Sequence, residues 1–122
     1  NRQELEELFQ VSLENRRAVI PYGQKLLAQG ARNVLISMAG EGAVLVAADG
    51  RVYEAAAPAG NLVNSVGAGD AMLAGFMAGY LERGEYGHAF RMGVATGSAS
   101  AFSEGFATRQ EVEALYPQVS CL

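Results

Sequence analysis

Residues 64–81 read NSVGAGDAMLAGFMAGYL, and this stretch decides the fold. Its second half is apolar at nearly every position, so the predicted helix has no polar face and is expected to be buried. Asp70 stands at the start of that helix, where backbone N–H groups lack partners and the helix dipole favours negative charge. Gly67 and Gly69 let the backbone approach a ligand closely. The stretch therefore predicts a phosphate cradle at a helix N-terminus, with a carboxylate beside it.

Asp70 also has a purely structural interpretation. Aspartate is a common N-cap, and glycine before a helix is ordinary turn chemistry. However, Asn64 and Ser65 already offer capping side chains, which leaves Asp70 superfluous as a cap. We therefore expect Asp70 to have a chemical role as well as its place at the start of the helix.

The rest of the chain predicts an α/β fold. Helical spacing predicts helices at residues 4–9, 89–102 and 109–116, the last capped by Thr108. It also predicts a second helix, between the first and residue 33, that ends near Gln29. Pro21 either places the start of the second helix near Val19 or kinks that helix. Short apolar runs predict strands at residues 33–37, 43–47, 51–55 and 62–63, with Asp49-Gly50 as a hairpin turn.

Three motifs together resemble a known family. NSVGAGDAMLAGF is preceded by SMAGEGA, in a strand–turn–strand unit, and followed by GVATGSASA. This order resembles the C-terminal half of the ribokinase-like, phosphofructokinase-B-type carbohydrate kinases, closest to the 1-phosphofructokinase and tagatose-6-phosphate kinase branch. The resemblance runs from Asn1 to about Ala107. It implies a three-layer αβα sandwich in which residues 1–122 are the C-terminal, ATP-binding and catalytic part, without the N-terminal half that carries the lid and most of the sugar site.

The resemblance also implies an activity. It is ATP-dependent phosphoryl transfer to a hydroxyl of a sugar phosphate, with fructose 1-phosphate converted to fructose 1,6-bisphosphate as the first expectation. Tagatose 6-phosphate is an alternative acceptor, as is an unphosphorylated sugar or nucleoside in a ribokinase- or adenosine-kinase-like member. A nucleotide-binding or oligomerising module is the non-enzymatic alternative, but such a module would have no need of Asp70. Without the sugar site, the chain alone is expected to be inactive.

Phosphoryl transfer needs a positioned hydroxyl, stabilisation of the equatorial charge and a proton acceptor. We predict that Asp70 is the general base. The N–H groups of Gly67, Ala68, Gly69 and Asp70 are the predicted anion hole. The resemblance implies the same roles for these residues, with ATP as the phosphoryl donor.

The resemblance assigns further residues to ATP and to metal ions. Those expected to line the ATP phosphates, ribose or adenine are Ser37, Gly40, Gly42, Val94, Gly97 and Ser98. Asn1 is expected to contact phosphate and Glu4 to organise Mg²⁺ through water. A monovalent-cation site found in many relatives, with K⁺ as the candidate ion, corresponds to Asn64, Val66, Ser100, Ser103 and Gly105.

Each assignment has a structural alternative. Asn1 and Glu4 also read as a helix-capping pair, residues 37–42 as a plain turn, and the small residues near Gly97 as helix packing. Two positions depart from the family pattern. Ala39 stands where the family usually has glycine, and Asn64 replaces an aspartate common in the ribokinase branch, so a K⁺ requirement stays open.

Composition restricts the partners and the location. A net charge of −4 without a run of basic residues argues against a nucleic-acid partner. The chain has no apolar span of the roughly 18 residues that a membrane helix needs, so no membrane partner is expected. Cys121, the only cysteine, suits a reducing, cytoplasmic location. Because the absent half would leave apolar surfaces uncovered, the chain is expected to self-associate into a homo-oligomer.

The histidine and the methionines are expected to have no chemical role. His88, the only histidine, follows the predicted turn at residues 84–87 in a polar stretch and is expected to be solvated at a helix start. The methionines are expected to fill gaps in the core. They are Met38, Met72, Met77 and Met92.

Overall fold

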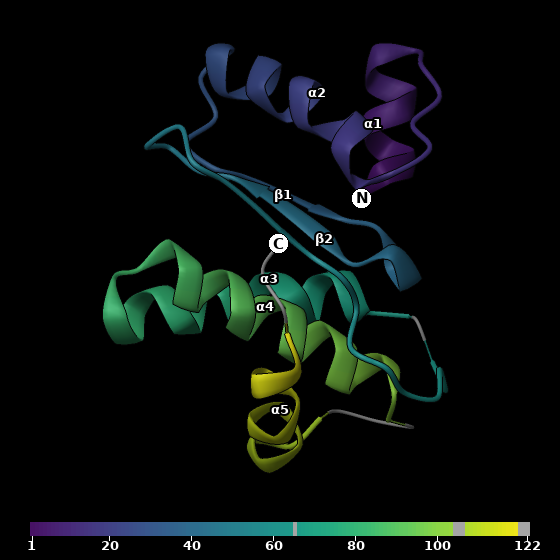
Figure 1. The fold of residues 1–122 in the computed structure, drawn as a ribbon, viewed down its shortest axis with the longest axis vertical. Helices are drawn as coiled ribbons and strands as arrows, with labels where there is room; N and C mark the ends of the chain where they lie inside the picture. The colour runs from purple at the N-terminus through teal and green to yellow at the C-terminus, as the bar shows by residue number, and fades with distance from the viewer. Residues whose placement is uncertain (65, 104–106, 120–122) are drawn as a thin grey trace.

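The structure is a computed structural model that describes residues 1–64, 66–103 and 107–119. It contains α-helices, β-strands and two short 3₁₀ turns, η1 and η2 (Figure 1). In chain order the elements are α1 (Arg2–Phe9), α2 (Arg16–Ala28), β1 (Val34–Ser37), η1 (Ala39–Glu41), β2 (Ala43–Val46), β3 (Val52–Ala55), α3 (Ala68–Arg83), α4 (Tyr86–Ala101), α5 (Arg109–Leu115) and η2 (Tyr116–Gln118).

The three strands form an antiparallel sheet in the order β1-β2-β3. Leu45 in the middle strand pairs with Leu35 on one side and with Tyr53 on the other. The predicted hairpin turn is confirmed: Gly50 has a φ of 86°, and Asp49 Oδ1 accepts a hydrogen bond of 2.9 Å from the Arg51 N–H. Because strand side chains alternate between faces, the sheet has two apolar faces, and each needs a covering layer.

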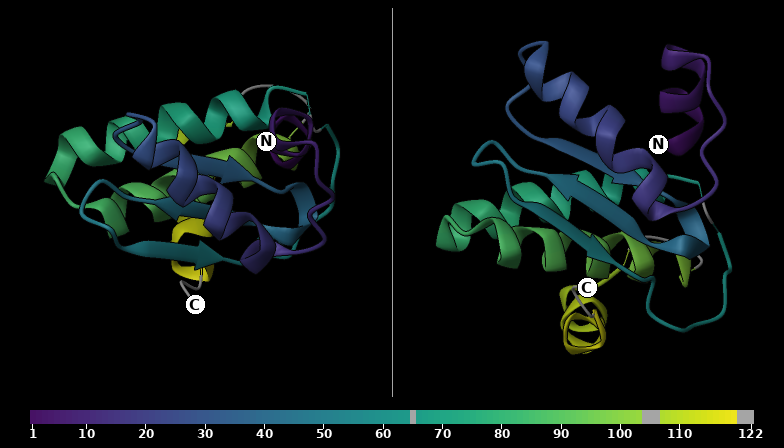
Figure 2. Two further views of the ribbon diagram at one scale, coloured as in Figure 1. Left: turned by 90° about the horizontal axis from the view of Figure 1, so that it is seen from above. Right: turned by 45° about the horizontal axis from the view of Figure 1, so that its top comes forward.

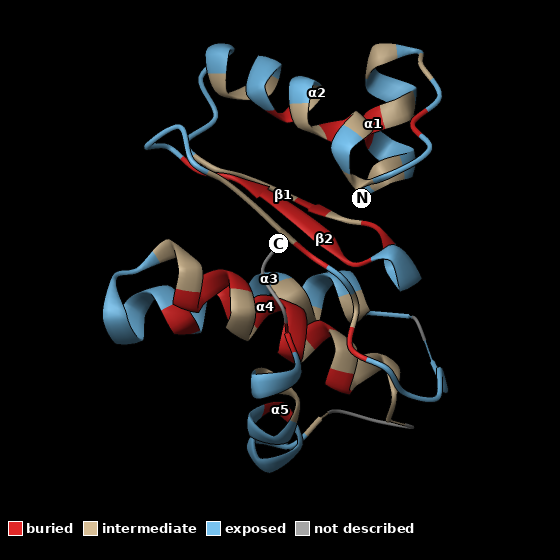
Figure 3. Cartoon of the chain, viewed as in Figure 1, coloured by how far each residue is buried: buried red, intermediate tan, exposed pale blue. Residues whose placement is uncertain are grey.

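Helices cover both faces of the sheet (Figure 2). Val44 and Val46 face α1 and α2, where they pack with Leu5 and Val19. Leu45 and its neighbours on the other face pack against α3 and α4, with α5 lying against α4. Figure 3 shows the buried residues concentrated along the sheet and on the helix faces turned towards it. The predicted three-layer αβα sandwich is confirmed.

Local capping explains where several helices begin. Asn15 Oδ1 accepts from the Ala18 N–H at 2.9 Å, so α2 begins at Arg16 and continues through Pro21. The alternative that α2 begins near Val19 is therefore wrong. Thr108 caps α5 as predicted, and a reciprocal capping box joins it to Glu111.

Helix α3 is not buried on all sides, contrary to the prediction from its composition. Gly75 and Gly79 allow one face to pack closely against α4, since a Cβ on Gly75 would lie 2.3 Å from Thr96 Oγ1. The opposite face is exposed, with Leu73 at 54%, Met77 at 55% and Leu81 at 83%. Met77 is thus not a core residue, whereas Met38 is buried, and Met72 and Met92 pack against the core. An apolar helix buries only the faces that neighbouring elements cover, and no described segment covers this one.

The segment before α3 is a loop, and residues 62–63 do not form the predicted strand. The N–H groups of Val63 and Asn64 both donate to the Ala101 carbonyl at 2.9 Å, so the segment is attached to the end of α4. A Cβ on Gly60 would lie 2.4 Å from the Phe102 ring, which shows how closely the loop approaches that end. Among the described helices, none is long and apolar enough to span a bilayer.

Candidate active site

The first turn of α3 presents backbone N–H groups without a side-chain cap. Gly67 is the N-cap residue, with a φ of 81°, and no side chain of the described residues bonds to this helix end. Asn64 does not cap α3, as its Oδ1 accepts from the Val66 N–H at 3.0 Å; Ser65 lies outside the described residues. The predicted anion hole of residues 67–70 is therefore a helix start whose N–H groups are open to a ligand.

Asp70 is the third residue of α3 and is exposed. Within the described part of the chain its carboxylate makes no hydrogen bond or ion pair, so it does not act as a structural cap. Because Asp70 lies in the first turn of α3, its carboxylate lies near any group bound at the helix start. The structure thus leaves Asp70 accessible to a ligand, while its role as a general base stays a prediction.

Two other elements meet the first turn of α3. A Cβ on Gly69 would lie 3.9 Å from Ser37 Oγ, so the end of β1 lies beside the predicted anion hole. Gly97 of α4 packs against the same turn, because a Cβ there would lie 3.0 Å from the Ala68 carbonyl oxygen. In Figure 1, the start of α3 and the end of α4 lie together at the right-hand end of the sandwich. Ser37, Gly69 and Gly97, predicted from separate motifs, are therefore neighbours.

The turn at residues 37–42 has a tightly specified backbone. The Met38 N–H donates to the Gly42 carbonyl at 2.9 Å, and the Gly42 N–H donates to the Ala39 carbonyl at 3.1 Å. Gly42 has a φ of 96°, and a Cβ there would lie 1.9 Å from the Ala55 carbonyl oxygen. No residue other than glycine fits at this position. Gly40 is exposed, and a Cβ there would meet nothing within 4 Å.

The predicted adenine-lining residues differ in their exposure. Val94 is 1% exposed and belongs to the core between the sheet and α4, where it packs as an ordinary buried side chain. Ser98 is half-buried, and its carbonyl accepts from the Phe102 N–H at 3.0 Å. The structure therefore accounts for Val94 through packing, as the alternative interpretation proposed.

Asn1 and Glu4 form the capping pair that their spacing also suggested. Asn1 Oδ1 accepts from the Glu4 N–H at 2.9 Å, and Glu4 Oε1 accepts from the Asn1 backbone nitrogen at 2.9 Å. Their phosphate and Mg²⁺ roles stay predictions. The described residues include no group of three His, Cys, Asp or Glu side chains that could hold a metal. Glu4 as a single carboxylate is compatible with an Mg²⁺ ion whose direct ligands are mainly water and phosphate oxygens.

The residues predicted for a monovalent cation lie where the 60–66 loop meets the end of α4. Asn64 and the Ala101 carbonyl are bonded directly, as described above, and the Ser100 carbonyl accepts from the Ser103 N–H at 3.3 Å. Ser103 Oγ lies 2.8 Å from both the Ala99 carbonyl oxygen and Glu111 Oε2. Gly105 lies outside the described residues. The structure brings together the described members of this set, although the Ser103 hydroxyl already makes hydrogen-bond contacts with Ala99 and Glu111.

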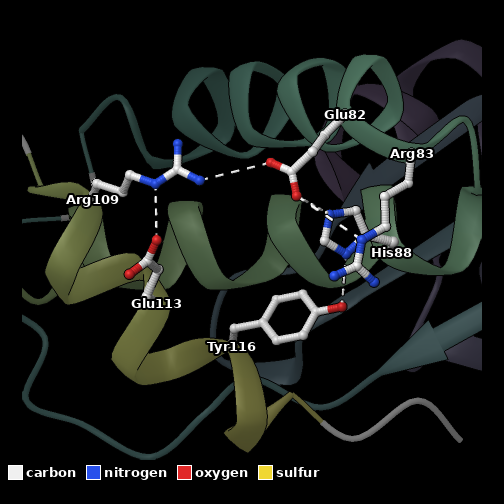
Figure 4. Close-up of polar contacts among 6 residues, drawn as sticks. All are labelled: Glu82, Arg83, His88, Arg109, Glu113 and Tyr116. Carbon is white, nitrogen blue, oxygen red and sulfur yellow. Dashed lines mark hydrogen bonds and ion pairs between the residues drawn. The ribbon is translucent and has the colours of Figure 1, made fainter.

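His88 is buried, at 8% exposure, and the prediction that it is solvated is wrong. Its Nδ1 lies 2.8 Å from the Tyr116 hydroxyl and its Nε2 lies 3.2 Å from Glu82 Oε1 (Figure 4). Arg109 approaches the same carboxylate, with Nη2 3.7 Å from Glu82 Oε2. No sequence signal indicated this cluster, since Tyr116 is 28 residues from His88.

The cluster around His88 joins α5 and η2 to the α3–α4 pair and lies far from Asp70. Glu82 is near the C-terminal end of α3 and Asp70 is in its first turn, so about three helical turns separate them. A hydrogen bond from Arg109 to Glu113, together with the charges of Glu113 and Glu82, raises the pKa of Arg109. These contacts hold the C-terminal helix in place and do not belong to the predicted site.

The chain is similar to known carbohydrate kinases in both sequence and structure. The chain is 48% identical over 119 residues to the 1-phosphofructokinase of Bacillus subtilis, covering 98% of this chain and 39% of that protein. It is 36% identical over 121 residues to the D-tagatose-1-phosphate kinase of Bacillus licheniformis, covering 98% of this chain and 39% of that protein. The crystal structure of Escherichia coli phosphofructokinase-2 in complex with potassium superposes with a TM-score of 0.85 at 26% identity, over 96% of this chain and 38% of that one.

The chain thus spans about two fifths of the length of the curated relatives it matches. A family model described as pfkB family carbohydrate kinase matches residues 1–112, which include every element from α1 to the middle of α5. That range contains the Gly67–Asp70 cradle, the 37–42 turn and Gly97. The chain belongs to the pfkB family of carbohydrate kinases.

Proposed function

We propose that the polypeptide carrying this chain transfers the γ-phosphoryl group of ATP to the free primary hydroxyl of a ketose 1-phosphate, with fructose 1-phosphate as its main acceptor. The observation that carries this proposal is the exposed Asp70 carboxylate beside an uncapped helix start, with Ser37 and Gly97 as neighbours. Similarity to the 1-phosphofructokinase of Bacillus subtilis supports the choice of acceptor. Residues 1–122 would form the ATP-binding and catalytic part.

In this reaction the C6 hydroxyl of fructose 1-phosphate attacks the γ-phosphorus of ATP. A new P–O bond forms as the bond to the bridging oxygen of ADP breaks, and Asp70 accepts the hydroxyl proton. The N–H groups at the start of α3 donate to the equatorial oxygens, whose negative charge the helix dipole also stabilises. The products are fructose 1,6-bisphosphate, ADP and a proton held by Asp70.

The cofactors we propose are ATP with Mg²⁺, and K⁺ as an activator. Gly42 and Gly97 allow the close packing of the 37–42 turn against β3 and of α4 against the first turn of α3, which together frame the proposed ATP site, and Glu4 is the outer carboxylate available to hydrated Mg²⁺. When bound, Mg²⁺ would neutralise charge on the transferred phosphates. The potassium in the Escherichia coli structure supports K⁺ as an activator, and we place it beside the 60–66 loop, where Asn64 Oδ1 already accepts a hydrogen bond from the Val66 N–H.

A tagatose phosphate is the second candidate acceptor. The relative in Bacillus licheniformis is a D-tagatose-1-phosphate kinase, so tagatose 1-phosphate fits the comparisons better than the tagatose 6-phosphate expected from the sequence. Fructose and tagatose 1-phosphates differ at one stereocentre and present the same C6 hydroxyl. We place the enzyme in the cytoplasm, where ATP and sugar phosphates are available, and expect it to form homo-oligomers.

The test is an assay of ADP formation by the complete polypeptide that carries residues 1–122. Fructose 1-phosphate, tagatose 1-phosphate, fructose 6-phosphate and ribose would be compared by kcat/KM with Mg·ATP. We expect the highest value for fructose 1-phosphate. Turnover that is greatest with ribose would overturn the proposed acceptor, and no turnover with any of the four would overturn the kinase function.

A further inference from the structure

The turn that follows β1 contains a strained residue. Ala39 has a φ of 49°, and among the described non-glycine residues only Gln10 shares a positive φ. Gln10 ends a helix, where this conformation is common, whereas Ala39 lies inside the 37–42 turn. Left-handed backbone is unfavourable for a residue with a Cβ and persists only where surrounding contacts hold it. Some part of the structure must therefore stabilise this turn.

Arg16 makes such a contact from the first turn of α2. Its Nη1 donates to the Glu41 carbonyl at 2.7 Å. Its Nε lies 3.7 Å from Glu54 Oε1 on β3, and both side chains are largely buried, at 24% and 13% exposure. The guanidinium is thus paired electrostatically with the Glu54 carboxylate, to which Nε makes no hydrogen bond, while Nη1 is hydrogen-bonded to the turn. Arg2 of α1 pairs with the Glu41 side chain, so the turn is held from both helices of its layer.

A shallow hollow lies beside Arg16 and the turn. It has a volume of about 340 Å³ and is lined by Asn15, Arg16, Arg17 and Glu41. Two arginines beside a hollow could also attract an anion directly by their charge. Arg16 could therefore act by supporting the turn or by attracting an anion. Only the second role would be shared by Arg17, which lines the hollow but makes no contact with the turn among the described interactions.

We propose that Arg16 is a positioning residue for the nucleotide. By bonding to the Glu41 carbonyl it keeps Ala39 in its left-handed conformation and Gly42 against β3, and so keeps the 37–42 turn in the shape that receives ATP. The proposal rests on the proposed kinase function of the site. It assigns no direct contact between Arg16 and the substrate.

Kinetics of the complete polypeptide test the proposal. We expect Arg16→Gln to raise the KM for ATP about tenfold, the effect of losing one charged hydrogen bond, with kcat and the KM for fructose 1-phosphate within about twofold. Arg16→Lys should recover part of the loss, because an ammonium can still donate to the Glu41 carbonyl. Arg17→Gln is the matched control and should leave the KM for ATP unchanged. An equal rise in both glutamine variants would overturn the proposal in favour of direct anion attraction.

The Ala39→Gly substitution provides a second, independent test of the positioning role. Glycine adopts a left-handed conformation without strain, so the turn should depend less on Arg16. The Ala39→Gly, Arg16→Gln double variant is expected to have a KM for ATP closer to wild type than Arg16→Gln alone. A double variant no better than Arg16→Gln would overturn the positioning role.

A structural measurement separates this proposal from the kinase function. The Glu41 and Gly42 N–H groups are bonded within the turn, to Met38 and Ala39, at 3.0 and 3.1 Å. In the chain of residues 1–122, Arg16→Gln should speed their hydrogen exchange about tenfold while the Leu45 amide is unaffected. Unchanged exchange would overturn the role of Arg16 even if the wild type is an active kinase. A wild type that does not use ATP would overturn the function, with or without faster exchange.

Discussion

Gly97 of α4 lies directly against Ala68, the first residue of α3, so closely that a Cβ on Gly97 would be 3.0 Å from the Ala68 carbonyl oxygen. The two helices therefore fix the position of the predicted anion hole relative to the rest of the domain. The absence of a side chain at Gly97 is what allows this approach.

We predict that Gly97→Ala destabilises the protein by about 1–3 kcal/mol relative to Gly87→Ala, since extra volume at a tight helix contact forces a backbone shift. Gly87 is the matched control on the same helix, because a Cβ there would make only an ordinary 3.7 Å contact with Tyr53. Urea unfolding of both variants measures the difference. Equal stabilities would show that α3 and α4 can separate freely at this point.

Asp70→Asn is expected to lower kcat of the complete polypeptide by about 10²-fold or more while leaving the KM for ATP nearly unchanged. Asparagine keeps the size of the side chain but cannot accept the hydroxyl proton. Because Asp70 is exposed and makes no bond in the described part of the chain, the variant should unfold at the wild-type temperature. A variant with near-normal kcat would refute the general-base assignment, because it would show that turnover does not need a proton acceptor at this position.

Gly42→Ala should destabilise the protein by about 3 kcal/mol or more, because the left-handed backbone and the Ala55 carbonyl both exclude a Cβ. Gly40→Ala, two residues earlier in the same turn, adds the same methyl group in open space and should change stability by less than about 0.5 kcal/mol. Thermal unfolding compares the pair. A tolerated Gly42→Ala would mean that the turn has another accessible conformation.

Acidification should weaken the contribution of Glu111 to stability. Hydrogen bonds from the Thr108 N–H first, and then from the Ser103 and Thr108 hydroxyls, lower the pKa of Glu111 in the folded state. A lowered folded pKa stabilises the native state above the ordinary glutamate pKa of about 4.3, and this contribution is lost as pH falls through the folded value. Glu111→Gln should therefore lower Tm at pH 7 more than at pH 3. A Tm difference that does not change with pH would contradict this account.

The exposed face of α3 should cause the chain of residues 1–122 to self-associate. Leu73, Met77 and Leu81 are spaced four residues apart and are all more than half exposed. The double variant Met77→Lys, Leu81→Glu should shift the chain towards monomer without lowering Tm, because neither side chain is buried. Light scattering across a concentration series measures this. A wild-type chain that stays monomeric at the highest concentration would refute the prediction.

Much of the architecture follows from local patterns. The Asp49-Gly50 hairpin and the Thr108 cap depend only on residues that are close together in the sequence, so both could be predicted without knowledge of the rest of the chain. Successive side chains of β2 enter the two cores in turn, and this alternation likewise follows from strand geometry. The predicted cradle also depends on a short stretch, residues 67–70, and the structure places it at a helix start as expected.

Other features depended on residues distant in the sequence. His88 lies in a polar stretch, and its burial comes from Glu82 and from Tyr116, which the packing of η2 against α4 brings to it. The composition of α3 indicated an apolar helix but not which face the sheet and α4 would cover. The strain at Ala39 likewise depends on Arg16, which reaches the turn from another helix.

The sequence by itself determined the resemblance to the family, through which the three-layer sandwich was expected, and the start of a helix at the predicted cradle, because motifs, turn residues and capping act over a few neighbouring positions. Only the tertiary structure decided which apolar side chains are buried, which polar ones meet and how Ser37, Gly69 and Gly97 come together. Those outcomes depend on the packing of segments far apart in the chain, and a local pattern contains no information about the partner that will cover it.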